Sequence, residues 1–192
     1  METLIFSTNN RHKADEIRSV LGNDFSITTL QESGINIEIP EPHDTLEANA
    51  GEKASVIYQL TGKDCFSEDT GLEVDALDGE PGVKSARYAG ENSSSVENIN
   101  KLLNRLSASK NRKARFRTVI CLLKAGKEYF FDGICPGTIS NEQKGLHGFG
   151  YDPVFIPDGS KKTFAEMDMA EKNVYSHRKK AMDKLLAFLT KK

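Results

Sequence analysis

Residues 115–134 read RFRTVICLLKAGKEYFFDGI. Two runs rich in aromatic, aliphatic and β-branched residues, Arg115–Lys124 and Lys127–Ile134, are separated only by Ala125-Gly126. A two-residue connection with glycine between two such runs is typical of a β-hairpin. We therefore predict a long antiparallel hairpin that forms the main body of a sheet, with Gly137–Ser140 as a candidate further strand.

The segments around this hairpin switch repeatedly between strand and helix patterns. Thr3–Ser7 has the apolar pattern of a buried strand, and Lys13–Leu21 places its apolar residues on one face of a helix. A second helix is predicted from Asp44, where Glu47 completes a capping-box pattern, to about Gly62. The other expected elements are a strand at Asp64–Ser67, a loop at Asp78–Gly82, a helix capped by Ser94 and Glu97, a solvated connector at Lys110–Arg115, a short helix capped by Asp168 and Glu171, and a final helix opened by Ser176.

Strands and helices are interspersed here without strict strand–helix–strand alternation. This pattern favours an α/β fold with a mixed, elongated central sheet, flanking helices, and two lobes with the active-site cleft between them. The length of 192 residues fits one two-lobed domain, residues 1–192, with a substantial apolar core. The residues of the third helix expected to face this core are Val96, Ile99, Leu102, Leu103 and Leu106.

The composition excludes several classes of function. Lys and Arg number 26 against 28 Asp and Glu, so the net charge of −2 provides no overall field for nucleic acid or a membrane surface. The longest aliphatic run, Val119–Leu123, is far shorter than the ~20 residues of a membrane helix, and no N-terminal signal pattern is present. Cys65, Cys121 and Cys135 are odd in number and lack zinc-site spacing, which favours buried thiols in a reducing compartment. We expect a soluble, cytoplasmic protein.

A phosphate site is predicted at Thr8-Asn9-Asn10-Arg11-His12-Lys13, between the first strand and its helix. Unpaired N–H groups and the dipole at a helix N-terminus favour an anion, and Lys13 adds a positive charge. The segment lacks the glycine spacing of a P-loop, and a polar turn with a surface lysine is an equally good reading of these residues alone. Lys53 on the second helix is a further candidate phosphate ligand, with a solvated lysine as the alternative.

Glu68 and Asp69 directly follow a predicted strand. An enclosed pair of carboxylates must share a proton or bind a cation, and Mg²⁺ prefers a few hard oxygen ligands completed by water and phosphates. Glu41, in the proline-flanked loop before the second helix, and nearby Glu38 are further candidate ligands. The alternative is that the pair lies in solvent at a strand end. Gly71 would permit a sharp turn after the pair.

The segment His147-Gly148-Phe149-Gly150-Tyr151-Asp152-Pro153 has the features of a site for a flat ligand. Its glycines allow close approach of the backbone, while Phe149 offers a stacking face and Asp152 an acceptor. A glycine-rich turn with its aromatic ring packed inward is the alternative. His177 and Arg178 lie in the first turn of the last helix, where cations oppose the helix dipole, and Lys172 lies shortly before them.

Five segments in this order together resemble the inosine triphosphate pyrophosphatase (Ham1-like) family. They are Thr8-Asn9-Asn10-Arg11-His12-Lys13, Ser67-Glu68-Asp69-Thr70-Gly71, Pro81-Gly82 with Ser85-Ala86-Arg87-Tyr88, Phe149-Gly150-Tyr151-Asp152-Pro153, and Glu171-Lys172-Asn173 with Ser176-His177-Arg178. The resemblance implies the Maf/Ham1 fold and a homodimer. It also implies an enzyme that uses Mg²⁺ to hydrolyse ITP, dITP and XTP to the monophosphate and pyrophosphate, which removes deaminated purines from the nucleotide pool.

Carried over by position, the resemblance assigns roles to individual residues. Thr8, Asn9, Asn10, Arg11, His12, Lys13 and Lys53 would bind the phosphates; Glu41, Glu68 and Asp69 the metal; and Phe149, Asp152, Lys172, His177 and Arg178 the nucleoside, with Thr70, Gly150 and Tyr151 as further substrate contacts. Asp69 would be the general base. Two positions depart from the family pattern, because many members have glycine at the position of Asn9 and aspartate at that of Glu68.

The residue types are consistent with one mechanism and leave two alternatives. Water activated by Asp69 would attack the α-phosphorus, and an Arg178 donor to the 6-oxo group would discriminate against the 6-amino group of ATP. A Maf-type pyrophosphatase of related fold is one alternative, although its serine- and arginine-rich signature is missing at Thr8–Lys13. A catalytically silent nucleotide sensor is the other, against which the intact Glu68 and Asp69 argue.

Overall fold

The computed structural model describes residues 2–191, which divide into two compact units. Unit 1 contains the described residues up to Asp69, Thr118–Gly133, and those from Arg178 onward; unit 2 contains Thr70–Arg117 and Ile134–His177. The strand order is β2-β1-β3-β5-β6-β7, and β4 pairs with β3. This is the mixed α/β architecture predicted from the sequence.

The strands and helices have the following bounds. The strands are β1 Glu2–Phe6, β2 Phe25–Thr29, β3 Cys65–Val74, β4 Pro81–Gly82, β5 Lys113–Lys124, β6 Lys127–Ile139 and β7 Phe155–Pro157. The α-helices are α1 Arg11–Arg18, α2 Leu46–Thr61, α3 Ser95–Arg105, α4 Met169–Tyr175 and α5 His177–Thr190. β1 is parallel to both β2 and β3, whereas β4 and β7 are antiparallel to β3 and β6.

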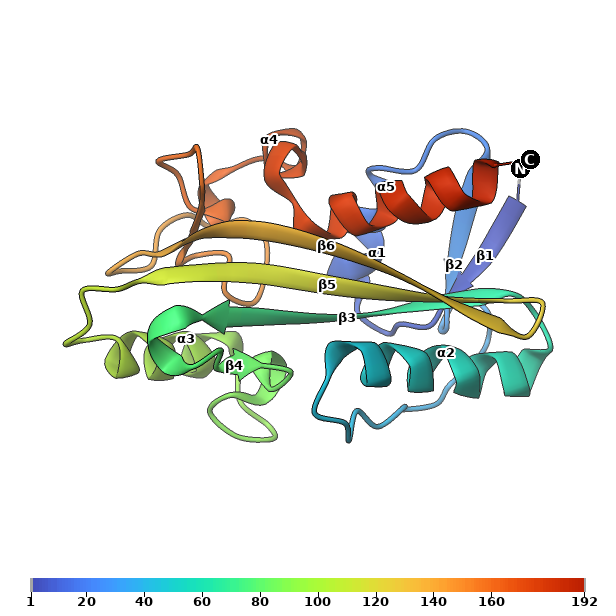
Figure 1. The fold of residues 1–192 in the computed structure, drawn as a ribbon, viewed down its shortest axis with the longest axis horizontal. Coiled ribbons are helices and arrows are strands. Elements are labelled where there is room, and N and C mark those ends of the chain that lie inside the picture. The colour runs from blue at the N-terminus through green and yellow to red at the C-terminus, as the bar shows by residue number, and fades with distance from the viewer. Residues whose placement is uncertain (1, 192) are drawn as a thin grey trace. The chain divides into compact units, whose positions relative to one another are not determined.

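In unit 1, helices cover both faces of the strands, with α2 on one side and α5 on the other (Figure 1). Alternation along β3 determines which side chain meets which helix. Phe66 points into the cluster formed with α1 and α5, while Cys65 and Ser67 donate hydrogen bonds to carbonyl groups of Ala54 and Ala50 on α2. The acidic residues that follow on β3 are held between these layers.

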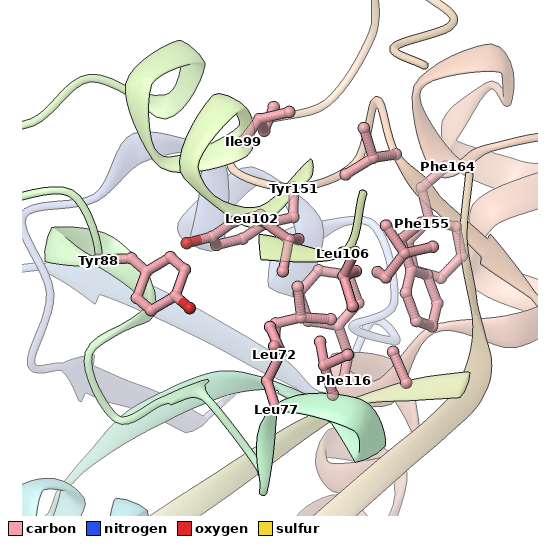
Figure 2. Close-up of a cluster of buried hydrophobic side chains, with 14 of the residues drawn as sticks. Leu72, Leu77, Tyr88, Ile99, Leu102, Leu106, Phe116, Tyr151, Phe155 and Phe164 are labelled. Carbon is pink, nitrogen blue, oxygen red and sulfur yellow. The ribbon is translucent and has the colours of Figure 1, made fainter. Parts of the chain in front are cut away.

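Unit 2 has its own apolar cluster (Figure 2), in which Leu72 of β3, Leu102 of α3, Phe116 of β5 and Phe155 of β7 are buried together. Ile99 and Leu106 join this cluster, and Leu103 packs partly against it, as the helical spacing predicted. Val96 is 55% exposed, so its assignment to the core was wrong. Its place in the first turn of α3 keeps it at the edge of the packed face.

Several predicted features are confirmed. The hairpin of β5 and β6 turns at Ala125 and Gly126 with φ of 49° and 75°. The Ser94–Glu97 capping box precedes α3, Asp168 caps α4, and Gly62 ends α2 in the left-handed conformation. Within residues 2–191, no helix is long and apolar enough to cross a membrane.

Element boundaries differ from the predictions in two helices. α1 begins at Arg11 rather than Lys13, because Asn10 is its N-cap, and it ends at Arg18 rather than Leu21. α2 is capped by Thr45, whose hydroxyl accepts the Ala48 N–H, so the predicted Asp44–Glu47 box is wrong by one residue. Serine, threonine, asparagine and aspartate all cap helices well, and the sequence does not rank neighbouring candidates.

The strands also extend beyond the predicted ranges. β5 begins at Lys113 within the predicted connector, and β6 runs through Gly137 to Ile139, so the predicted strand at Gly137–Ser140 is the end of β6. Part of the predicted loop, Pro81–Gly82, pairs with β3. β3 itself continues to Val74, and Gly71 lies inside it rather than at a turn: a Cβ there would approach the carbonyl oxygen of Gly82 to 2.7 Å.

Candidate functional site

The predicted phosphate loop folds around the start of α1. The hydroxyl of Thr8 accepts the Asn10 N–H at 3.1 Å, and Asn10 Oδ1 accepts the Lys13 N–H at 3.2 Å. Among residues 2–191, only Asp78 and Ala125 are non-glycine residues with positive φ, so Asn9 occupies its position without left-handed backbone. Its side chain instead donates to the carbonyl of Ile37 at 3.1 Å. Asn9, Asn10, Arg11 and His12 are all exposed.

Glu68 lies at the centre of a buried ion network. Its Oε1 is 2.9 Å from Lys13 Nζ, and its two oxygens accept hydrogen bonds from Nε and Nη2 of Arg178 at 2.7 and 3.0 Å. The remaining terminal nitrogen of Arg178 pairs with Glu16 of α1. Arg178 is 2% exposed and the Glu68 side chain 0%. The network therefore joins the phosphate loop to the first of the predicted metal carboxylates.

A second network holds Asp69. Lys53 Nζ pairs with Glu41, donates to the backbone carbonyl of Glu68 at 2.7 Å, and lies 3.4 Å from Asp69 Oδ1. Asn49 donates to Asp69 Oδ2 at 3.2 Å. Lys53 is buried, so the alternative of a solvated lysine is wrong, while its role as a phosphate ligand stays a prediction.

The two neighbouring carboxyl groups have opposite electrostatic environments. Burial would raise the pKa of Glu68, but the charges of Arg178 and Lys13 outweigh it and hold that pKa well below its usual value. At Asp69 burial is the largest influence, Lys53 compensates only in part, and Glu41 adds repulsion, so its pKa is raised. Burial also acts against the charge on Lys53, yet Asp69 and Glu41 raise its pKa overall.

In unit 2, the predicted base segment is organised around Asp152. Its Oδ2 accepts the Phe149 N–H at 2.9 Å and lies 2.6 Å from Lys172 Nζ, which is itself 5.4 Å from the centre of the Phe149 ring. Asp152 and Lys172 are buried, whereas Phe149 and Gly150 are half-buried. Gly148 has a φ of 75°, and a Cβ there would meet Asp152 Oδ2 at 2.1 Å.

Other predicted site residues lie inside the packed structure. Tyr151 is 3% exposed, and its hydroxyl donates to the Ser85 carbonyl at 2.9 Å. His177 is buried and stacks on Phe116, with ring centroids 4.6 Å apart. Thr70 is half-buried on β3 next to Asp69. The structure thus groups the residues predicted for phosphate and metal in unit 1, and Phe149, Asp152 and Lys172 in unit 2.

Two residues of the unit 1 networks were not predicted from the sequence: Glu16 and Asn49. Glu16 lies three residues after Lys13 on α1, and Asn49 four residues before Lys53 on α2, so each shares a helix face with a predicted site residue. Helical spacing from a predicted residue was the available signal. A lone acidic or amide residue on a helix is usually solvated, and nothing in the sequence separates these two from the others.

Within residues 2–191, no three His, Cys, Asp or Glu side chains are grouped closely enough to hold a metal by themselves. Glu68 is turned toward Arg178 and Lys13, while Glu41 and Asp69 share Lys53.

Comparison with known proteins gives a consistent result over nearly the whole chain. Residues 4–188 match the Ham1 family. The dITP/XTP pyrophosphatases of Flavobacterium johnsoniae and Porphyromonas gingivalis are 49% and 51% identical, covering 97% and 98% of both sequences in each comparison. Among solved structures, the Staphylococcus aureus Ham1 protein is 36% identical with a TM-score of 0.88 and covers 98% of each chain; a HAM1 protein from Coxiella burnetii is 34% identical with a TM-score of 0.89 and covers 99%.

Proposed function

The chain belongs to the Ham1 family, and we propose on that basis that it is a pyrophosphate-releasing hydrolase of deaminated purine nucleotides. Its substrates are ITP, dITP and XTP, and its products are the nucleoside monophosphate and pyrophosphate. The relatives that share about half of its residues along the full length are named for dITP and XTP. Removal of deaminated purines from the nucleotide pool follows from that reaction.

One contact carries this proposal: the ion pair between Lys13 and Glu68, at 2.9 Å. It holds the N-terminus of α1, which could bind a triphosphate, next to the carboxylates of β3, which could hydrolyse it. Lys13 would exchange its bond to Glu68 for one to the phosphates when the substrate binds.

Asp69 is the residue that we assign as general base. Burial raises the pKa of Asp69 above its ordinary value, which makes it a better proton acceptor than Glu68, whose pKa two cations hold low. Asp69 accepts a proton from water as the water oxygen bonds to the α-phosphorus. The bond from that phosphorus to the bridging oxygen breaks, and pyrophosphate leaves with the electron pair.

The carboxylates fit Mg²⁺ in chemistry and charge. Glu68 is bound by two cations, Arg178 and Lys13, whereas Glu41 and Asp69 share Lys53. Glu41 and Asp69 are therefore the first ligands that we propose, with Glu68 completing the predicted set. When bound, Mg²⁺ would neutralise charge on the triphosphate and on the pyrophosphate leaving group.

For purine recognition, the geometry supports Phe149 and Lys172 more than Arg178. The ring of Phe149 is partly accessible, and Asp152 fixes both its backbone N–H and the neighbouring Lys172 ammonium. Arg178 instead has three nitrogens engaged by Glu68 and Glu16. We therefore propose that Arg178 positions Glu68, in place of the predicted bond to the 6-oxo group.

The assembly and location remain proposals by family resemblance: a homodimer in the cytoplasm, with no nucleic acid partner. The thiols of Cys65, Cys121 and Cys135 are all buried, which accords with a reducing compartment.

The test is a product analysis. The protein is incubated with ITP and Mg²⁺, with ATP in a parallel reaction, and the products are resolved by chromatography. We expect IMP and pyrophosphate from ITP, without orthophosphate, and much slower turnover of ATP. Asp69→Asn should lower kcat by about 10²- to 10⁴-fold while KM changes little. Formation of IDP and orthophosphate would refute the reaction type.

A further inference from the structure

Asn49 is a fully buried amide on α2 that touches both the proposed base and the loop that carries Glu41. Its Oδ1 accepts the backbone N–H of His43 at 2.9 Å, and its Nδ2 donates to the His43 carbonyl at 3.1 Å and to Asp69 Oδ2 at 3.2 Å. The His43 N–H requires an oxygen opposite it, which orients the amide with Nδ2 toward Asp69.

Lys53 lies one helical turn further along the same face of α2. It approaches the other oxygen of Asp69, Oδ1, at 3.4 Å and also pairs with Glu41, two residues before His43. The carboxylate of Asp69 is thus held at both oxygens from one helix, and the same two side chains secure the loop at residues 41–43. An asparagine and a lysine four residues apart therefore act on one carboxylate.

We propose that Asn49 is a positioning residue for hydrolysis, which fixes the direction of Asp69 and the place of the Glu41 loop without touching the substrate. This inference rests on the proposed function, in which Asp69 accepts the proton. A base must meet the attacking water at hydrogen-bond distance, and a displacement of about 1 Å can lower turnover by about a hundredfold. Asn49 prevents rotation of the carboxylate that Lys53 alone would allow.

Asn98 provides a matched control in unit 2. It is 4% exposed and lies four residues after its helix N-cap, Ser94, just as Asn49 lies four residues after Thr45. Its Oδ1 accepts the Ala89 N–H at 2.7 Å, and its Nδ2 donates to the Ala86 carbonyl at 3.0 Å. It thus secures the loop at residues 86–89 by the same chemistry, and this loop contains none of the residues assigned to proton transfer or metal binding.

The experiment compares Asn49→Ala, Asn98→Ala and Asp69→Asn in steady-state kinetics with ITP, below the melting temperature of each variant. Calorimetric binding of a non-hydrolysable ITP analogue and thermal unfolding are measured in parallel. We expect both alanine variants to lose thermal stability. Asn49→Ala should lower kcat by about ten- to a hundredfold, with KM and analogue affinity changed by less than about twofold, while Asn98→Ala should keep its kcat.

Asn49→Asp tests the same inference if Asn49→Ala does not fold. It keeps the volume and the acceptor for the His43 N–H but places a carboxylate oxygen against Asp69 Oδ2, so we expect a larger loss of kcat than in Asn49→Ala. Normal kcat in the Asn49 variants together with an inactive Asp69→Asn would overturn the inference and leave the proposed function intact. An equal loss of kcat in Asn98→Ala would also overturn it, since turnover would then follow stability alone. Normal kcat in Asp69→Asn would refute the assignment of the base itself.

Discussion

Replacing Arg178 by methionine should destabilise the protein strongly, because two buried carboxylates would lose their common partner. The side chains of Glu68 and Glu16 are 0% and 5% exposed, and both are paired with Arg178. Removing one partner from a buried ion pair typically costs about 3–5 kcal/mol. For a chain of this length, each 1 kcal/mol lowers Tm by about 2–4 °C, so we expect a decrease of about 6–20 °C at pH 7.

The pH dependence of this loss follows from the same contacts. In the wild type, Arg178 and Lys13 overcome burial and keep the pKa of Glu68 below its ordinary 4.5, so this pair stabilises the fold above about pH 4.5 and loses its effect as the pH falls through the folded-state pKa. In Arg178→Met, Arg178 no longer opposes the effect of burial, so Glu68 takes up a proton at a higher pH. The difference in unfolding free energy between the two proteins should therefore be largest near neutrality and shrink in acid.

Urea unfolding followed by circular dichroism, at neutral and acidic pH, measures this difference. Arg115→Met is the control, because Arg115 is 52% exposed and its ion pair with Glu73 should contribute no more than about 1 kcal/mol. Adding Glu16→Gln to Arg178→Met should recover part of the lost stability by removing one buried charge. Two results would contradict the role of Arg178 in this network. One is a loss of unfolding free energy in Arg178→Met no greater than in Arg115→Met, and the other is a loss that grows in acid.

Three further predictions concern the base site, the metal and the thiols. Phe149→Ala should raise KM for ITP by about 5- to 150-fold with a smaller change in kcat, because it removes stacking worth about 1–3 kcal/mol. Phe130→Ala is the control: this ring on β6 is 46% exposed, and its loss should leave KM unchanged in the same assay. Excess EDTA should abolish turnover and Mg²⁺ restore it; undiminished activity in EDTA would exclude the metal. Burial raises the pKa of Cys65 to about 11 and of Cys121 to about 12, so iodoacetamide at pH 8 should modify neither thiol until urea is added. The free energy of unfolding should also fall between pH 9 and 12, because the thiols of the unfolded chain ionise first. Rapid labelling of the folded protein would contradict this.

Local patterns predicted much of the fold correctly because local chemistry determines those elements. The Ala125-Gly126 turn, the Ser94–Glu97 box and the Gly62 stop depend on residues adjacent in sequence. The continuation of β3 through Gly71 was missed because it depends on the backbone of Gly82, which closes against a position without a side chain. Glycine looks the same in a sequence whether it permits a turn or a close contact.

The site shows the same limit in its charged residues. Sequence patterns identified Lys13, Glu68 and Arg178 as functional candidates, but not which cation faces which carboxylate. The pairing of Arg178 with Glu68 spans 110 residues, and that with Glu16 spans 162. Only the fold brings such side chains together, so spacing along the chain cannot identify their partners. The opposite pKa shifts of Glu68 and Asp69 depend on those partners and could not be predicted either.

The division of the chain into interleaved segments has a consequence for how this protein can be taken apart. The backbone passes from one unit to the other after Asp69, Arg117, Gly133 and His177. No single cut in the gene releases either unit whole. A chain ended at His177 would keep every residue of unit 2 yet leave Glu16 and Glu68 without Arg178. Recombination therefore cannot exchange one unit for a relative's by a single crossover, and the two must be inherited and engineered as one module.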